Sequence, residues 1–169
     1  MVPPNLITDI QIINSNSKLC VGLCIEHSLN NSRAKELWRQ FMPRLTEIEN
    51  RVTTSLLSIQ IYNSNEYFEN FNTDKPFNTW SAVEVIDLDC IPDGMQSIVI
   101  PKGNYATFIH KGGVDSFSDI FHYFYTSWLS QSQWILDSNR PHFEVLGDRF
   151  LGPDHPDSEE EIWIPVMDK

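Results

Sequence analysis

The sequence predicts an α+β fold in which a β-α-β-β unit is duplicated and the two copies join edge to edge in one antiparallel sheet, with both helices on one face. Two observations support this. Each half contains one helix-periodic segment, and strand-like segments surround that helix in the same order over residues 7–88 and 95–167. Residues 1–169 are expected to form a single domain with a central ligand cleft along the pseudo-two-fold axis.

Four segments of the first half have the apolar content and alternation of strands. They are expected at Ile7–Ile13, Leu19–Glu26, Leu56–Tyr62 and Asn78–Asp87. The residues 14–18 between the first two have turn chemistry, so these two strands are expected to form a hairpin. Residues 63–76 lack clean periodicity and are expected to be a loop.

A helix is expected from about Arg33 to Asn50 in the first half. Its apolar residues recur at helical spacing: Leu37, Trp38, Phe41, Leu45 and Ile48. Pro43 lies inside this segment and should bend or break the helix, because proline lacks the amide proton that the helix needs.

The second half repeats this order. Its strands are expected at Gln96–Ile100, Tyr105–His110, Arg140–Leu146 and Glu160–Val166. Its helix is expected to begin at Asp115 or Ser116 as the cap and to end near Ser130. The apolar face of that helix is Phe117, Ile120, Phe121, Phe124, Trp128 and Leu129.

The chain is acidic, with a formal net charge of -11. A field of this sign repels phosphates, so direct nucleic-acid binding is not expected, and it favours cationic ligands. The same charge can also serve only to keep the protein soluble.

The cysteines are three in number, at positions 20, 24 and 90. They are expected to be free thiols, since no second cysteine pair or histidine pair accompanies them as a zinc site would require. Neither a metal nor a cofactor is expected. A cytoplasmic location is expected, because no signal peptide is evident and no apolar run approaches the ~20 residues of a membrane span.

Glu144 is the first candidate functional residue. On its strand Phe143 and Val145 point one way, while His142, Glu144 and Leu146 point the other. In an apolar cleft, its carboxylate would resist ionisation unless a cation or a donor compensated it, which suits either a counter-ion or a general acid or base. The alternative is a surface glutamate on an edge strand.

Aromatic residues supply the other candidates. Trp163 alternates with Ile162 and Ile164, so it lies on the opposite face from them, either in the cleft or solvent or as a core residue. The further candidates are Tyr62, Trp80, Glu84, Tyr105 and Phe108, a set that would suit a planar hydrophobic ligand or, ring by ring, an ordinary core. The run 159–161 is expected to be solvated.

Classical catalytic motifs are absent from the sequence. It contains no glycine-rich phosphate loop, no Gly-x-Ser-x-Gly and no His-Glu-x-x-His. The five histidines are scattered and are expected to be ordinary titrating residues.

Several segments together resemble the GyrI-like small-molecule-binding family, which is also the effector-binding domain of AraC-type and MerR-type multidrug regulators. They are 37–41, 80–85, 91–95, 100–106, 108–112, 128–129, 140–144 and 161–166. The resemblance implies a duplicated fold of the SHS2 type with a central cleft. It also implies that a cleft glutamate, here Glu144, contacts cationic or polar ligands among aromatic walls, one of them Trp163.

The expected function is therefore a binding protein for hydrophobic, often cationic, small molecules. Strand signals begin by about Ile7 with no helix-turn-helix ahead of them, so the chain is expected to act without its own DNA-binding domain. Members of this kind resemble ligand sequestrators, gyrase-inhibitory proteins, or hydrolases of cyclopropane-bearing toxins in which Glu144 would assist water attack. A protein partner or a homodimer is also possible for the interaction-module alternative.

Overall fold

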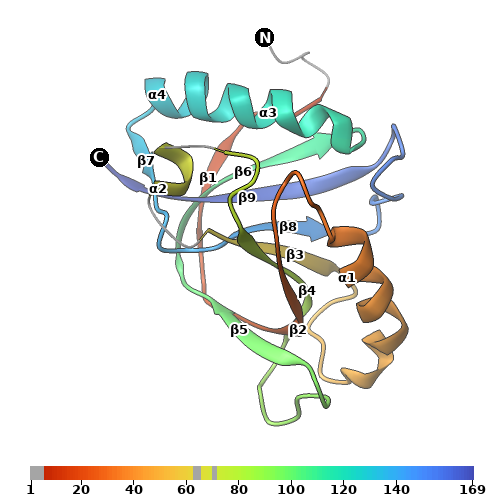
Figure 1. The fold of residues 1–169 in the computed structure, drawn as a ribbon. Helices are drawn as coiled ribbons and strands as arrows, with labels where there is room; N and C mark the ends of the chain where they lie inside the picture. Colours follow the sequence, from red (N-terminus) through yellow and green to blue (C-terminus); the bar gives the residue numbers. More distant parts are fainter. Residues whose placement is uncertain (1–5, 63–65, 70–71) are drawn as a thin grey trace.

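The computed structural model describes residues 6–62, 66–69 and 72–169, and in this part of the chain nine strands form one curved antiparallel sheet (Figure 1). The strands are β1 (Gln11–Ser15), β2 (Lys18–His27), β3 (Leu56–Ile61), β4 (Phe77–Val85), β5 (Gln96–Ile100), β6 (Gly103–Lys111), β7 (Trp134–Leu136), β8 (His142–Leu146) and β9 (Glu159–Asp168). Their order is β1-β6-β9-β8-β3-β4-β2-β5, and the short β7 pairs with β9.

The helical segments are short. They are α1 (Ala34–Phe41) with a 3₁₀ extension (Met42–Glu47), α2 (Glu66–Glu69), a 3₁₀ turn (Val114–Ser116), α3 (Phe117–Tyr123), a π-helical segment (Phe124–Trp128) and α4 (Leu129–Gln131). The last three run on without a break as one rod over the sheet (Figure 1). Pro43 occupies the start of the 3₁₀ segment, so the predicted break in the first helix is confirmed.

The order strand, helix, strand, strand occurs twice, as β2-α1-β3-β4 and as β6-α3-β8-β9. The two sets meet where β3 pairs with β8, which joins them in one sheet. The predicted fold class is therefore confirmed.

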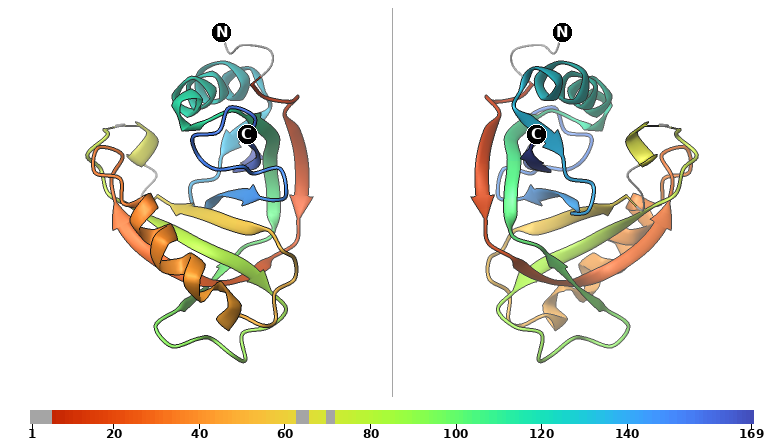
Figure 2. Two further views of the ribbon diagram at one scale, coloured as in Figure 1. Left: turned by 90° about the vertical axis from the view of Figure 1, so that its right-hand side faces the viewer. Right: turned by 90° about the vertical axis from the view of Figure 1, so that its left-hand side faces the viewer.

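Both helices lie on the same face of the sheet, α1 over β2 and β4 and α3 over β6 and β9 (Figure 2). α1 covers a cluster that includes Val21 and Val83, while α3 covers Phe108 and Ile162. A row of directly paired residues on this face links the two patches: Ser81, Ser58, Glu144, Ile162 and Phe108. Glu144 therefore lies midway between the two helices.

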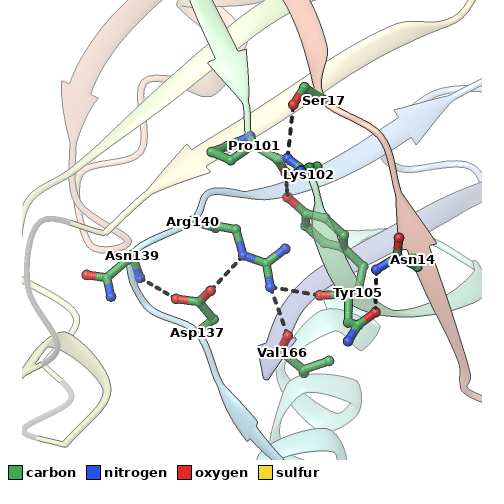
Figure 3. Close-up of polar contacts among 10 residues, drawn as sticks. Asn14, Ser17, Pro101, Lys102, Tyr105, Asp137, Asn139, Arg140 and Val166 are labelled. Atoms are coloured by element: carbon green, nitrogen blue, oxygen red, sulfur yellow. Dashed lines mark hydrogen bonds and ion pairs between the residues drawn. The ribbon is translucent and has the colours of Figure 1, made fainter. Parts of the chain in front are cut away.

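The predicted hairpin of the first two strands is wrong. β1 pairs with β6, whereas β2 pairs with β4 and β5. The sheet curls enough to bring its two end regions together, so the chain passes from β1 to β2 without reversing. Ser17 lies between β1 and β2, and Lys102 lies between β5 and β6. The backbone N–H of Lys102 donates a hydrogen bond to the Ser17 hydroxyl, which links these two connections (Figure 3).

Smaller differences concern the segments without clean periodicity. The expected loop 63–76 contains α2, although residues 63–65 and 70–71 lie outside the described part. β7 was not predicted, since three residues carry too little pattern. The first strand begins four residues later than expected, with Ile7 contributing an isolated bridge to His110.

Arg140, a mostly buried arginine, links several segments of the second half by hydrogen bonds (Figure 3). Arg140 donates from Nε to Asp137 (2.7 Å) and from Nη2 to the carbonyl oxygens of Asn104 (2.9 Å) and Val166 (2.8 Å). Its guanidinium lies 4.6 Å from the ring centre of Tyr105. A side chain at Gly103 (φ 150°) would place its Cβ 2.3 Å from Arg140 Nη1, so the close approach requires glycine there.

None of the helices in the described part of the chain combines the length and the apolar character needed to span a bilayer.

Candidate ligand-binding cleft

A cleft of about 550 Å³ lies on the helix-covered face of the sheet. α1 and the segment before it form one wall, α3 forms the other, and β3, β8 and β9 form the floor. Its lining includes Trp38, Ser58, Tyr62, Phe77, Phe117, Phe121, His142, Glu144, Glu160 and Ile162. This volume and this mixture of rings with few polar groups are typical of sites for small organic ligands.

Glu144 is a half-buried carboxyl on the floor of the cleft. It faces Ser58 directly across the β3–β8 pair, and the Ser58 hydroxyl donates a hydrogen bond to it. Loss of water around the carboxyl, and then the charge of Glu160, raise its pKa to about 8, while the bond from Ser58 acts in the opposite direction. At neutral pH the group therefore holds a proton that it can surrender when a positive charge arrives.

Glu160 is a second acid of the cleft, although the run 159–161 was expected to be solvated. Its residue is only 8% exposed. His110 Nδ1 lies 3.0 Å from Glu160 Oε1, and His110 Nε2 lies 2.7 Å from the Ser116 hydroxyl oxygen. The Ser116 hydroxyl thus forms hydrogen bonds with His110 and with the carbonyl of Gly113. Its side chain does not cap α3 as predicted.

Aromatic rings close one end of the cleft. Tyr62 lies 4.9 Å from His142 and 5.2 Å from Phe77, measured between ring centres. Phe68 of α2 stacks on His142 at 5.5 Å and lies 5.4 Å from Tyr125. Burial raises the pKa of Tyr62, so its hydroxyl stays protonated and its ring remains neutral.

His142 does not titrate as an ordinary histidine. It is buried, and this desolvation lowers its pKa to about 3. Its Nε2 lies 3.0 Å from the Tyr125 hydroxyl, which can donate to the neutral ring. The imidazole of His142 consequently carries no positive charge at neutral pH that would oppose a cation.

α3 presents a second aromatic stripe to the cleft. Phe117 and Phe121 stack at 5.7 Å, and Phe121 and Tyr125 at 6.4 Å. These three residues are four apart, so they form one ladder along the helix, whereas Ile120 and Phe124 pack into the core below.

The candidates predicted from sequence fall on two faces. Glu144 and Tyr62 line the cleft, and Phe108 lies on the same face but is buried under α3. The others belong to the opposite face: Trp163, Trp80, Glu84 and Tyr105. The structure does not bring these two groups together.

Trp163 borders the cleft only as a member of the strand that forms its floor. Its ring stacks on Phe143 at 5.2 Å, lies 5.9 Å from Tyr105, and donates from Nε1 to the exposed Glu161. Both Glu144 and Trp163 border the cleft, but alternation along β9 directs the Trp163 ring to the face opposite Glu160 and Ile162. A shared contact of Glu144 and Trp163 with one ligand therefore stays a prediction.

Trp80, Glu84 and Tyr105 have structural partners on that opposite face. Trp80 and Tyr105 are buried in one core cluster. The Tyr105 hydroxyl donates to the carbonyl of Pro101, and Glu84 pairs with Lys18 at 3.3 Å.

Replacing Trp163 by alanine is expected to lower the free energy of unfolding by about 2 kcal/mol, because a half-buried stacked ring is lost. Ligand affinity should change less than about twofold, since the ring points away from the cleft. Urea unfolding and calorimetric titration measure the two quantities. A fall in affinity at unchanged stability would place Trp163 in the site after all.

Sequence reasoning missed Glu160, His142 and the ladder on α3. The spacing of Phe117, Phe121 and Tyr125 was a readable signal for a second apolar stripe. Glu160 had a weaker signal, since it shares its strand face with Ile162 and Ile164. Among the described residues, no group of three or more His, Cys, Asp or Glu side chains is arranged to hold a metal ion.

Comparisons with known proteins identify the type of domain. Residues 8–167 match the GyrI-like small molecule binding domain. The chain is 26% identical over 135 residues to the transcriptional regulator BrlR of Pseudomonas aeruginosa, a match that covers 78% of this chain and 45% of the regulator. The chain thus spans less than half the length of that relative.

Solved structures share the fold at low identity. The structure of SAV2435 bound to tetraphenylphosphonium has a TM-score of 0.64 at 18% identity, covering 95% of this chain and 94% of that one. The EcmrR C-terminal domain has a TM-score of 0.68 at 15% identity, covering 95% and 98%. In each case the likeness concerns the fold.

Proposed function

The chain belongs to the GyrI-like family of small-molecule-binding domains, and from this premise we propose that its cleft binds hydrophobic organic cations. One observation carries the proposal: a half-buried carboxyl, Glu144, lies on the floor of a cavity walled by aromatic rings, where loss of water raises its pKa. Tetraphenylphosphonium, the ligand in the similar structure of SAV2435, has this chemistry.

Recognition would combine three contributions. Burying the apolar surface of the ligand against Phe117, Phe121 and Phe77 supplies the hydrophobic part. Rings near the charge add about 0.5–2 kcal/mol each through cation–π contact. Glu144 releases its proton and becomes the counter-ion, which the cation itself makes favourable. Such a sum is sufficient for micromolar affinity, about 8 kcal/mol.

In a cell this binding would serve to sense or sequester such compounds. The domain type occurs in effector-responsive regulators, and the match to BrlR supports an effector-binding role. Any effect on transcription would then require a DNA-binding region, supplied by the same protein or by a partner.

The test is calorimetric titration with tetraphenylphosphonium and with triphenylphosphine oxide, a neutral compound of related shape. The cation should bind and the neutral compound should bind at least about tenfold more weakly, because it cannot use Glu144. Tyr62→Leu should weaken the cation about tenfold through lost cation–π and stacking contact. No heat and no thermal stabilisation with any lipophilic cation would refute the proposal.

A second candidate is hydrolysis of strained cyclopropane-type electrophiles. The raised pKa of Glu144 favours it, since a carboxyl that keeps its proton near neutral pH can act as a general acid. Incubation with a spirocyclopropane electrophile, followed by mass spectrometry, tests for ring opening with added water. Turnover that survives Glu144→Gln would exclude Glu144 from that chemistry.

A further inference from the structure

Glu160 and Glu144 face the same cleft from neighbouring strands. Glu144 pairs with Ile162 across β8 and β9, and Glu160 precedes Ile162 by two residues on the same face. The two glutamates are therefore diagonal neighbours, about 7–8 Å apart along the sheet surface. Both line the cavity between α1 and α3.

The carboxyl group of Glu160 is held in place by hydrogen bonding. The buried His110 bonds its Oε1, and Ser116 in turn bonds His110 Nε2. Phe117 packs on the His110 ring at 4.6 Å, which fixes the imidazole from the side of α3. These contacts fix the position of the Glu160 carboxyl at the cleft.

The charged and titratable groups around Glu144 come from every wall of the cleft. β9 contributes Glu160, and Tyr62, His142 and Tyr125 lie at the aromatic end, all three uncharged at neutral pH. At the rim, Lys35 of α1 pairs with Asp154 at 3.9 Å, and His27 hydrogen-bonds the backbone N–H of Arg33 through Nδ1. Apart from the Lys35–Asp154 pair at the rim, the described lining holds two acids, Glu144 and Glu160, and no lysine or arginine.

We propose that Glu160, positioned by His110 and Ser116, is a second cation-binding carboxylate that adapts the cleft to ligands with two positive centres about 7–8 Å apart. The inference rests on the proposed function and narrows its ligand class. One positive centre pairs with Glu144 and the other with Glu160, while the apolar linker lies over Ile162 between them. A single cation can contact only one of the two carboxyl groups.

The experiment compares α,ω-bis(trimethylammonium)alkanes of three to ten methylenes with the alkyltrimethylammonium ions of equal chain length. Calorimetry at pH 8.5, where Glu144 is largely ionised, should show the best dication binding at least about tenfold more tightly than its monocation. The optimum is expected near the chain length that spans the two acids. Glu160→Gln should abolish this advantage and change the affinity for the monocation less than about threefold.

Glu161→Gln is the matched control. It removes the same charge from the neighbouring position of β9, but its side chain is exposed on the other face, so it should leave the dication preference intact. NMR titration without ligand gives a separate readout. Glu160→Gln should lower the pKa of Glu144, and Glu161→Gln should not.

The outcomes separate the two proposals. If the wild-type protein binds the monocations but prefers no dication, or if Glu160→Gln keeps the preference, the second-carboxylate inference is overturned and the proposed function stands. If no organic cation binds the wild-type protein, the proposed function fails and the inference fails with it.

Discussion

Replacing Arg140 by alanine is expected to lower the free energy of unfolding by about 3 kcal/mol, because breaking a mostly buried ion pair leaves its partners unpaired. Asp137 would lose its cation, and the carbonyl groups of Asn104 and Val166 would lose their donor. The Tyr105 ring would also lose the guanidinium that covers it. Urea unfolding followed by tryptophan fluorescence measures the change.

Two further variants test whether the loss comes from the contacts of Arg140. Gly103→Ala should destabilise by a similar amount, since its Cβ would displace the same guanidinium. Arg33→Ala removes an exposed pair with Glu36 on α1 and should cost less than about 0.5 kcal/mol. If Arg140→Ala also costs this little, water replaces the guanidinium and the fastening role is wrong.

Replacing Glu144 by glutamine is expected to make the protein more stable at alkaline pH and to weaken cation binding there about 30-fold or more. The folded-state pKa of about 8 lies above the ordinary glutamate pKa of 4.5. Between these values the native state holds more protons than the unfolded state, so stability falls as pH rises through this window. The variant lacks this loss and should gain on the wild type by up to about 1.4 kcal/mol per pH unit.

Affinity should show the opposite trend. Binding of a cation to the wild type releases the Glu144 proton below pH 8, so affinity rises with pH and levels off above that value. The glutamine variant should bind weakly with a much flatter profile. Calorimetry at pH 6.0, 7.0 and 8.5 in two buffers of different ionisation enthalpy measures both the affinity and the proton release. Equal pH profiles for the two proteins would mean that Glu144 is not the titrating group.

Local sequence signals predicted most of the fold. Alternation placed the strands, helical spacing placed α1 and α3, and Pro43 marked the end of α1. The duplicated order also predicted that both helices cover one face. The predicted hairpin of β1 and β2 was wrong. Strand pairing depends on the curl of the whole sheet, which the few turn residues between two strands do not reveal.

The site was predicted in part. Alternation on β8 correctly assigned Glu144 to the face opposite Phe143, but it could not say on which face the cleft opens. Trp163 was consequently grouped with Glu144. The acidic neighbours of Glu160 predicted that its side chain would be solvated. Its buried position instead depends on a hydrogen bond with His110, fifty positions away in the chain.

The pairing of β1 with β6 has a consequence for how the chain reaches its native state. β1 completes the sheet of the second half, yet it is the first strand to be synthesised. Gln11 of β1 pairs with Thr107 of β6, 96 residues later. β5, at the middle of the chain, completes the first half by pairing with β2. Neither half thus contains all of its own strands, and separating them by cleavage between β4 and β5 would leave each with an unpaired edge. Contacts of such long sequence separation slow folding, so the halves would form together, after synthesis has passed β9.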